Sequence, residues 1–305
     1  MILMATLTEI LDGIPQEEKI VVAVAAAADF EVLEAVHRSL QRNLASFRLF
    51  DDMDKLLKAI QESHPYLKDH PKIKIHHVSG HLSAAEEAVK SVSTKDSDVL
   101  MKGHIPTAVL MKAVLHPEFG LRTGQVLSHV AVFEIENFER LVFVTDAGMN
   151  IEPDLQRKAE IIQNAVAFAH SIGVEMPVVA PLAAIEVINP LMQATVDAAA
   201  LAVMNKRGQI TGCIVDGPLA LDNAISLKAA KHKGISTKSA GIADILLVPT
   251  IESGNILYKS LVYFSKAKVG GVIVGAKAPI VLTSRADSAE TKLFSLALAI
   301  RSSSI

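Results

Sequence analysis

Short apolar segments alternate with amphipathic segments along the whole chain, and this alternation constrains the fold more than any other feature of the sequence. Near the start, an apolar run at 19–25 precedes a helical pattern at 29–40. Near the end, an apolar run at 280–282 precedes a helical pattern at 288–300. Such alternation is typical of parallel sheets covered by helices, and sheets of this kind bind ligands at the carboxyl ends of their strands.

The length of the chain sets the number of domains. With 305 residues, half of them hydrophobic, it can build one large or two medium-sized α/β domains. The alternation is interrupted at Gly120-Leu-Arg-Thr-Gly124, which predicts a hinge. We therefore expect two lobes that meet at a cleft.

The charge balance argues against several classes of partner. The formal net charge is −3, with 30 Lys and Arg residues against 33 Asp and Glu and no basic block, so we expect no nucleic-acid partner. The longest apolar runs are interrupted by charges well short of a membrane span, so we expect no membrane partner. Cys213 is the single cysteine and lies in an apparent buried strand, which favours a core thiol over a nucleophile. A lone cysteine and an acidic N-terminus without a signal-peptide pattern lead us to expect a cytoplasmic protein.

The loop between the last predicted strand and the last predicted helix carries groups suited to an anion. Ser284 and Arg285 would place a hydroxyl and a guanidinium beside the outward-facing amides of a helix N-terminus. Asp287 or Ser288 can cap that helix, with Glu290 in a capping-box relation to Asp287. An ordinary polar loop with a solvated arginine explains the same residues equally well.

Polar residues follow other predicted strands as well. Lys102-Gly103-His104 leads into a helix predicted to hold Pro106 in its first turn, and a capping or core role for His104 is as well founded as a substrate contact. Each of the remaining residues is by itself a typical cap or turn residue, and only their number on one rim indicates a site: Asp146, Asn150, Asp216, Glu252 and Asn255.

Two other motifs do not have the spacing that their chemistry needs. Gly270 to Lys277 resembles a phosphate-binding loop, but Ala276 separates Gly275 from the lysine, so a glycine-rich strand and turn is the better interpretation. His76, His77 and His81 have no acidic partner at a metal-ligand spacing, so we expect structural roles and no metal site.

Several of these stretches together resemble the phosphate acetyl/butyryl transferase family. They occur in the family's order between about 101 and 301, and Gly120-Leu-Arg-Thr-Gly-Gln-Val-Leu-Ser-His129 and Ser284-Arg-Ala-Asp-Ser288 look like its butyryl branch. The other matching stretches are Lys102-Gly-His-Ile-Pro-Thr-Ala108, Thr145-Asp-Ala-Gly-Met-Asn-Ile-Glu-Pro153, Val215-Asp-Gly-Pro-Leu-Ala220 and Pro249-Thr-Ile-Glu-Ser-Gly-Asn-Ile-Leu-Tyr-Lys259.

The resemblance implies a fold and a reaction. It implies two α/β lobes of the isocitrate/isopropylmalate dehydrogenase-like type, which we expect at 1–126 plus 273–305 and at 127–272, with the active-site cleft between them. It implies a homodimer or larger homo-oligomer that transfers a short acyl group, butyryl preferred, reversibly between CoA and inorganic phosphate. CoA and phosphate would be substrates, and we expect no metal or redox cofactor.

The resemblance also implies roles for residues. Arg285 would hold phosphate against the thioester carbonyl, and Ser284 would hydrogen-bond the carbonyl oxygen or the sulfur as the tetrahedral intermediate forms. Direct transfer without an acyl-enzyme is expected. The residues that we expect to bind substrate are Lys102, Gly103, Thr107, Lys112, Arg122, Asp146, Asn150, Asp216, Glu252, Asn255 and Lys259.

One departure from the family concerns the proton of the CoA thiol. The acetyl branch has an Asp seven residues after the serine, where this chain has Thr291, which cannot accept a proton at neutral pH. Asp287, Glu290 or His104 could take its place, or the partly ionised thiol needs little help.

Two alternatives remain at this point. The first is the same chemistry on acetyl-CoA. The second is a non-catalytic acyl-CoA sensor of the same fold, against which the intact Ser284-Arg285 pair argues.

Overall fold

The computed structural model describes residues 6–15, 19–235, 237, 239–284 and 287–303. The chain divides into two compact units. One, here called the N-terminal unit, consists of Thr8–Gln125 and Gly270–Ile305, and the other, the central unit, consists of Met1–Leu7 and Val126–Val269. The boundary at Gln125 directly follows the glycine-containing stretch in which we expected a hinge.

The sheet of the N-terminal unit is parallel except at one edge. Strands β3, β2, β1, β4 and β11 lie side by side in that order and run parallel, and β10 pairs with β11 in the antiparallel sense. The bounds are β1 (Val21–Ala25), β2 (Ser46–Asp51), β3 (Ile73–His77), β4 (Val99–Lys102), β10 (Lys268–Val274) and β11 (Ile280–Val281).

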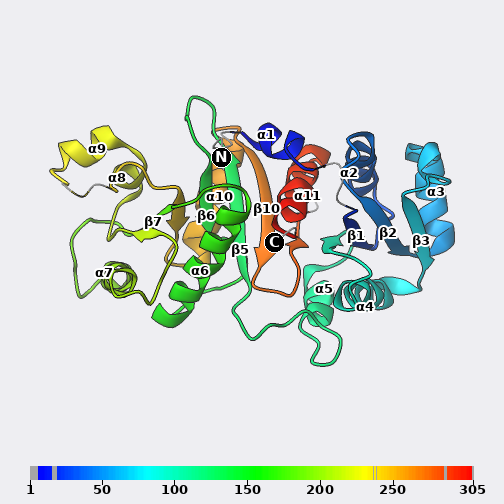
Figure 1. Cartoon of the computed structure of the whole chain (residues 1–305), viewed down its shortest axis with the longest axis horizontal. Coiled ribbons are helices and arrows are strands. Elements are labelled where there is room, and N and C mark those ends of the chain that lie inside the picture. The colour runs from blue at the N-terminus through cyan, green and yellow to red at the C-terminus, as the bar shows by residue number, and fades with distance from the viewer. Residues whose placement is uncertain (1–5, 16–18, 236, 238, 285–286, 304–305) are drawn as a thin grey trace. The chain divides into compact units, whose positions relative to one another are not determined.

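Helices cover both faces of this sheet. Figure 1 shows α4 and α5 along one side of the strands and α2 along the other, and α11 contacts α2. The helices are α1 (Leu7–Asp12), which spans a unit boundary, α2 (Phe30–Gln41), α3 (Met53–Ser63), the short 3-10 helix η1 (Pro65–Leu67), α4 (Gly80–Ser93), α5 (Thr107–Val114) and α11 (Ala289–Ser303).

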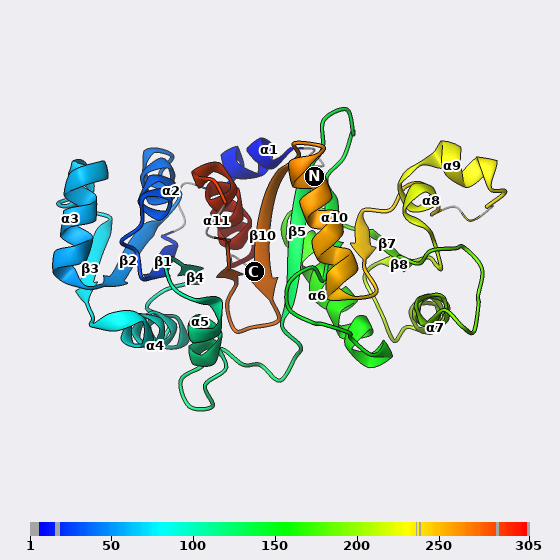
Figure 2. The ribbon, with the colours of Figure 1, turned by 180° about the vertical axis from the view of Figure 1, so that it is seen from behind.

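The central unit is a mixed sheet with helices on both faces. Its strand order is β5-β6-β9-β7-β8, antiparallel between β5 and β6 and parallel elsewhere. Helix α6 lies in front of the strands in Figure 1, whereas α10 lies in front of them in the opposite view of Figure 2. The strands are β5 (Ser128–Glu134), β6 (Val142–Thr145), β7 (Val178–Pro181), β8 (Ile214–Val215) and β9 (Ile245–Leu247). The helices are α6 (Leu155–Ser171), α7 (Gln193–Lys206), α8 (Leu221–Ile225), α9 (Leu227–His232) and α10 (Ile251–Tyr263).

Both units therefore have the predicted α/β architecture, with mostly parallel strands between layers of helices. The strands are buried because both faces are covered, and β1, β4, β6 and β7 are almost entirely inaccessible. Within the part of the chain that the structure describes, none of the helices is long and apolar enough to cross a bilayer.

Two prolines lie just before helices. Pro106 was expected in the first turn of a helix, but it precedes α5, which starts at Thr107. Pro153 lies two residues before the start of α6 at Leu155. Asp154 precedes α6 because its carboxylate accepts a hydrogen bond from Arg157 N at 2.8 Å, which satisfies one of the first unpaired amides. Cys213 was expected within a buried strand, but it lies directly before β8 at Ile214–Val215.

The glycine-rich stretch at 270–277 is explained by packing. A Cβ atom at Gly270 would lie 2.7 Å from Leu298 Cδ1 and 3.0 Å from the backbone of Phe294, both on α11. Gly270 thus lets α11 approach β10 closely. The interpretation of this stretch as a strand and turn is confirmed.

Candidate functional site

Three neighbouring parallel strands of the N-terminal unit end at the same edge of the sheet. Ala25 of β1 pairs with Lys102 of β4, and Met101 pairs with Val281 of β11. The loops that follow, at 26–29, 103–106 and 282–288, therefore start side by side. They contain four of the residues that the sequence proposed as catalytic.

Gly103 lets the first two of these loops touch. Its amide donates to Ala25 O at 2.8 Å, and the amide of His104 donates to Ala26 O at 2.7 Å. A Cβ atom at position 103 would lie 2.0 Å from Ala26 O, so a side chain there would force the backbone apart. The predicted role of Gly103 in binding substrate stays a prediction, and its structural role is this close approach.

Lys102 joins the second loop to the third. The side chain is buried, with the residue 4% exposed, and Nζ donates to Gly103 O and to Thr283 O, each at 3.3 Å. Its ammonium group therefore links the two loops by donating hydrogen bonds to a backbone carbonyl of each.

His104 lies beside Asp29, a residue that the sequence did not single out. His104 Nδ1 is 3.4 Å from Asp29 Oδ2, and the two side chains are 45% and 30% exposed. The other carboxylate oxygen, Oδ1, accepts from Val32 N at 3.1 Å and so caps α2. Asp29 was missed because an Asp before an apolar periodic segment has the pattern of an ordinary helix cap.

The third loop is shaped by Asp287. Its Oδ2 accepts a hydrogen bond from Ser284 N at 2.6 Å, and the Lys292 ammonium group donates to its backbone oxygen. Ser284 itself is exposed. Ser288, the other capping candidate, accepts from Thr291 N at 3.2 Å and therefore caps α11.

The remaining predicted residues of this unit lie on the surface. Glu290 is exposed in the first turn of α11, Thr107 and Lys112 are exposed on α5, and Arg122 is exposed next to a backbone bridge to Ala276. Arg285 lies outside the described residues, so its predicted contact with phosphate stays a prediction.

Asp146 in the central unit organises a turn. The residue is 3% exposed, Oδ1 accepts from the amides of Gly148 and Met149 at 2.9 Å, and Oδ2 accepts from Asn150 N at 3.2 Å and Nδ2 at 2.6 Å. Asn150 Nδ2 also donates to Leu127 O at 2.8 Å. The structure thus brings these two predicted residues together, with their polar groups turned towards the turn's own backbone.

The other predicted residues of the central unit are spread over two elements. Asp216 Oδ2 accepts from Ser239 Oγ at 2.5 Å. Glu252 and Asn255 were expected in a strand-to-helix turn, but both lie within α10. Lys259 lies on the same helix, and all three residues are exposed. Helix α10 packs closely on the 146–150 turn at Gly254, whose Cβ would lie 2.9 Å from the Ala147 Cα.

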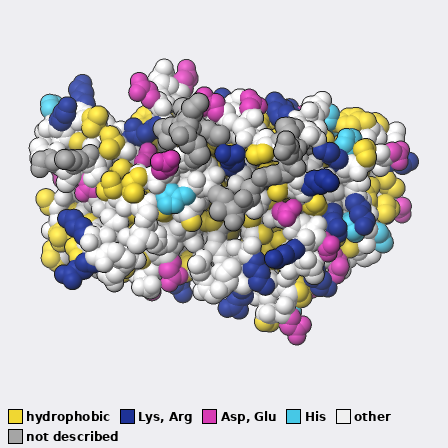
Figure 3. Space-filling model, in the orientation of Figure 1, with side chains coloured by type: hydrophobic (Ala, Val, Ile, Leu, Met, Phe, Trp, Pro, Cys, Tyr) yellow, Lys and Arg dark blue, Asp and Glu magenta, His cyan; other side chains and the backbone are white. Residues whose placement is uncertain are grey.

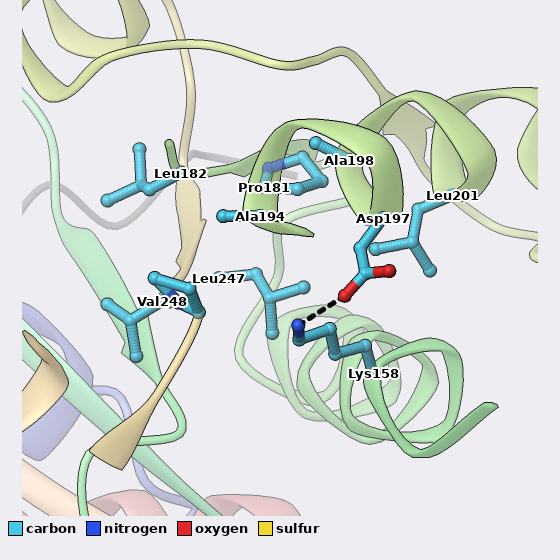
Figure 4. Close-up of a pocket in the computed structure, with 10 residues that line it drawn as sticks. Lys158, Pro181, Leu182, Ala194, Asp197, Ala198, Leu201, Leu247 and Val248 are labelled. Carbon is cyan, nitrogen blue, oxygen red and sulfur yellow. Dashed lines mark hydrogen bonds and ion pairs between the residues drawn. The ribbon is translucent and has the colours of Figure 1, made fainter. Parts of the chain in front are cut away.

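A small cavity in the central unit is bounded by a buried ion pair (Figure 4). Lys158 Nζ of α6 lies 2.6 Å from Asp197 Oδ2 of α7, with side-chain exposures of 6% and 9%. The cavity has a volume of about 10 Å³, roughly the space of one water molecule, and is lined otherwise mainly by apolar residues such as Leu182, Leu201 and Leu247. None of the predicted site residues that the structure describes lines it. The sequence did not reveal this pair, because its members are 39 residues apart on different helices.

His76, His77 and Cys213 have structural surroundings, whereas His81 is exposed at the start of α4. His76 stacks on Phe50 with ring centroids 4.7 Å apart, and His77 Nδ1 accepts from Met53 N at 3.1 Å. Burial raises the pKa of the Cys213 thiol to about 11, as suits a core residue. Among the described residues, no group of three or more His, Cys, Asp or Glu side chains could hold a metal ion. On the face drawn in Figure 3, basic and acidic side chains are interspersed.

Known proteins resemble the chain in sequence and in fold. The family model described as phosphate acetyl/butaryl transferase matches residues 66–300. A probable phosphate butyryltransferase of Bacillus subtilis is 58% identical over 92% of this chain and 92% of its own length. A phosphate acetyltransferase of Thermotoga maritima is 48% identical over 90% of this chain and 92% of its own length.

Solved structures agree with these relatives. The crystal structure of a branched-chain phosphotransacylase from Enterococcus faecalis has a TM-score of 0.83 and 39% identity, and the match covers 93% of this chain and 99% of that one. A 4-hydroxythreonine-4-phosphate dehydrogenase from Klebsiella pneumoniae, with a TM-score of 0.57 and 12% identity over 94% of this chain and 100% of that one, shares the fold alone. The chain belongs to the phosphate acetyl/butyryl transferase family.

Proposed function

We propose that this protein is a phosphate acyltransferase that moves a short acyl group, butyryl preferred, reversibly between CoA and inorganic phosphate. The observation that carries the proposal is the exposed Ser284 beside the His104 loop at the ends of three parallel strands, in a chain 58% identical to a probable phosphate butyryltransferase. The proposed substrates are acyl-CoA and phosphate, with no cofactor.

The proposed chemistry is a direct transfer. A phosphate oxygen attacks the thioester carbonyl, and the C–S bond breaks as the acyl phosphate forms. The Ser284 hydroxyl donates to the developing oxyanion, and loss of one such donor typically costs about 3 kcal/mol of barrier, on the order of a hundredfold or more in rate. Arg285 holds the phosphate as a forked cation. The polar residues exposed on α5 and α10 are proposed to contact CoA.

The assay follows the release of free thiol from acetyl-CoA, butyryl-CoA and a branched acyl-CoA, with and without phosphate. We expect phosphate-dependent release with a higher kcat/KM for butyryl-CoA than for acetyl-CoA. Two additional buried methylenes are worth about 1.6 kcal/mol, roughly a fifteenfold preference. Ser284→Ala should reduce kcat on the order of a hundredfold or more.

Other outcomes would identify the alternatives. A higher kcat/KM for acetyl-CoA would indicate an acetyltransferase, for which the 48% identical relative from Thermotoga maritima is the support. Binding of acyl-CoA without phosphate-dependent turnover would indicate a sensor and contradict the proposal.

We also propose that the protein is a cytoplasmic homodimer or larger homo-oligomer with no nucleic acid or membrane partner. Helix α7 supports self-association, because it has a second apolar stripe with Val196, Ala199 and Ala200 only half-buried and Val203 49% exposed. Light scattering after size-exclusion chromatography measures the mass, and a monomer at micromolar concentration would contradict this part of the proposal.

A further inference from the structure

We propose that His104, held by Asp29, accepts the proton of the CoA thiol when an acyl phosphate is the acyl donor, and returns it to sulfur in the opposite direction. This proposal rests on the proposed acyl transfer and assigns the proton acceptor within it. Asp29 is a positioning residue, which acts through His104.

The geometry fixes the histidine from one side. Asp29 Oδ1 is held by Val32 N, so Oδ2 is turned to His104 Nδ1 at 3.4 Å. This separation suits an ion pair and is longer than a good hydrogen bond, and catalytic hydrogen bonds often tighten only when substrate is bound. A carboxylate beside Nδ1 favours the tautomer with hydrogen on Nδ1, which leaves the Nε2 lone pair as the proton acceptor on a side chain 45% exposed.

The other carboxylates of these loops are engaged with backbone amides. Asp287 Oδ2 accepts from Ser284 N at 2.6 Å, and buried Asp51 accepts from Ala28 N and Asp52 N, each at 2.8 Å. Glu290 is exposed one turn into α11. Thr291 has a hydroxyl, which is no base at neutral pH.

The charged groups around His104 come from three elements. Asp29 follows β1, Lys102 ends β4 and donates to the carbonyls of Gly103 and Thr283, and Lys292 of α11 donates to Asp287 O. Among these described groups, only the Asp29 carboxylate lies within ion-pair distance of His104, where it can stabilise the protonated ring. The two ammonium groups act on backbone carbonyls of the neighbouring loops.

The proton balance is complete with the substrates alone. In the thiol direction, the S–H bond breaks, its proton moves to His104 Nε2, sulfur bonds to the acyl carbon, and the C–O bond to phosphate breaks with its electron pair going to phosphate. The departing phosphate then takes the proton from the imidazolium, which regenerates the base. In the opposite direction, hydrogen phosphate gives its proton to His104 as its oxygen bonds to the acyl carbon, and the imidazolium passes that proton to the sulfur as the C–S bond breaks.

The test compares the full-length protein with three variants in both directions between pH 5.5 and 9. His104→Gln removes the base. Asp29→Asn removes the carboxylate and keeps an oxygen that caps α2, because Asn caps as well as Asp. Asp52→Asn is the matched control: Asp52 caps α3 by accepting from Lys55 N at 3.1 Å, and loses the same charge in the same unit.

We expect His104→Gln to lower kcat on the order of a hundredfold, in line with the typical contribution of a general base, while KM for phosphate and acyl-CoA changes less than about threefold. The acidic limb of the kcat profile in the thiol direction should disappear in this variant. In Asp29→Asn that limb should move to lower pH, because the imidazolium loses its anion, whereas Asp52→Asn should match the wild type.

Chemical rescue separates a catalytic role from a structural one. Imidazole added to His104→Ala should restore activity in proportion to its neutral form. A His104→Gln kcat within about twofold of the wild type, or a loss that imidazole does not rescue, would overturn the assignment of His104. An unchanged profile in Asp29→Asn would overturn the role of Asp29. Wild-type protein without phosphate-dependent transfer would contradict the proposed function itself, which is a different result.

Discussion

The two units use polar strand-end residues in opposite ways. In the central unit, Asp146 is 3% exposed and its carboxylate accepts hydrogen bonds from its own turn. Lys158 there forms a buried ion pair with Asp197. In the N-terminal unit, Asp29 and His104 are half-exposed, and the buried Lys102 acts on loop carbonyls. A polar residue after a strand is therefore no indicator of chemistry by itself. Its exposure and the partners of its lone pairs decide whether it holds a turn or faces a ligand.

The largest effect is expected at the buried ion pair of the central unit. Lys158→Met should lower the free energy of unfolding by about 3–5 kcal/mol, because it leaves the Asp197 carboxylate buried without its cation. Denaturant unfolding measures this loss. The double variant Lys158→Met with Asp197→Leu should recover much of it, and a double variant as unstable as the single one would show that packing rather than charge is responsible.

The second test replaces one strand-end residue of each unit with alanine and compares the losses of stability. Asp146→Ala should cost about 3 kcal/mol of unfolding free energy, because buried amides of its turn lose their acceptor. His104→Ala should cost less than about 1 kcal/mol, because an exposed pair contributes little to stability. Asp146→Asn, which keeps one acceptor oxygen and replaces the other with an NH2 donor, is the intermediate control. Equal losses in Asp146→Ala and His104→Ala would contradict the contrast between the units.

The third test uses one glycine from each unit. Gly103→Ala should lower the unfolding free energy by about 1–3 kcal/mol, because its Cβ would lie 2.0 Å from Ala26 O. Gly148→Ala is the matched control, since its nearest contact would be His129 Cγ at 3.4 Å, an ordinary packing distance. A larger loss at Gly148 than at Gly103 in denaturant unfolding would refute this ranking.

A smaller effect should appear in the pH dependence of stability. Burial lowers the pKa of His76, and that of His37, below the usual 6.5. The native state then binds fewer protons than the unfolded state, so this stability is present above pH 6.5 and is lost as the pH falls towards the native pKa. Burial raises the pKa of Asp244 in the central unit, so its contribution is present below 3.8 and is lost as the pH rises through the native pKa.

His76→Phe isolates the first of these contributions. The variant keeps an aromatic ring against Phe50, so stability between pH 7 and 5 should fall less steeply than in the wild type. The same substitution at His232, which is exposed on α9, serves as the control and should leave the slope unchanged. An unaltered slope in His76→Phe would exclude this histidine as a source of acid sensitivity.

The smallest perturbation is alkylation of Cys213, which reports on opening of the central unit. Burial raises the pKa of this thiol to about 11, so at pH 8 the native protein should react with iodoacetamide much more slowly than the protein in denaturant. Equal rates in the two states would show that the region around Cys213 opens freely. Mass spectrometry of the labelled chain provides the measurement.

Much of the fold was predictable, because the periodicity of apolar residues gives strands and helices directly. The start of α5 was displaced because a proline fits several positions around a helix start. At α6 it is the carboxylate of Asp154 that marks the start. That the loops carrying the candidate residues follow neighbouring strand ends could also be predicted. The task of each residue could not, because it depends on which amides a loop turns towards a side chain, as at Asp287.

The second role of Asp29 also could not be predicted from the sequence. Its position before α2 identifies a helix cap, and the structure agrees. The second carboxylate oxygen faces His104, which lies 75 residues further along the chain (104 − 29) and follows the neighbouring strand. Only the pairing of β1 with β4 brings them together.

The buried ammonium group of Lys102 has a consequence for how ligands reach these loops. Since it is bonded to Gly103 O and Thr283 O at once, neither segment can swing outward alone without leaving a cation in an apolar interior. The two segments thus form a single preorganised surface, and a ligand that binds there must fit that surface as it stands before binding.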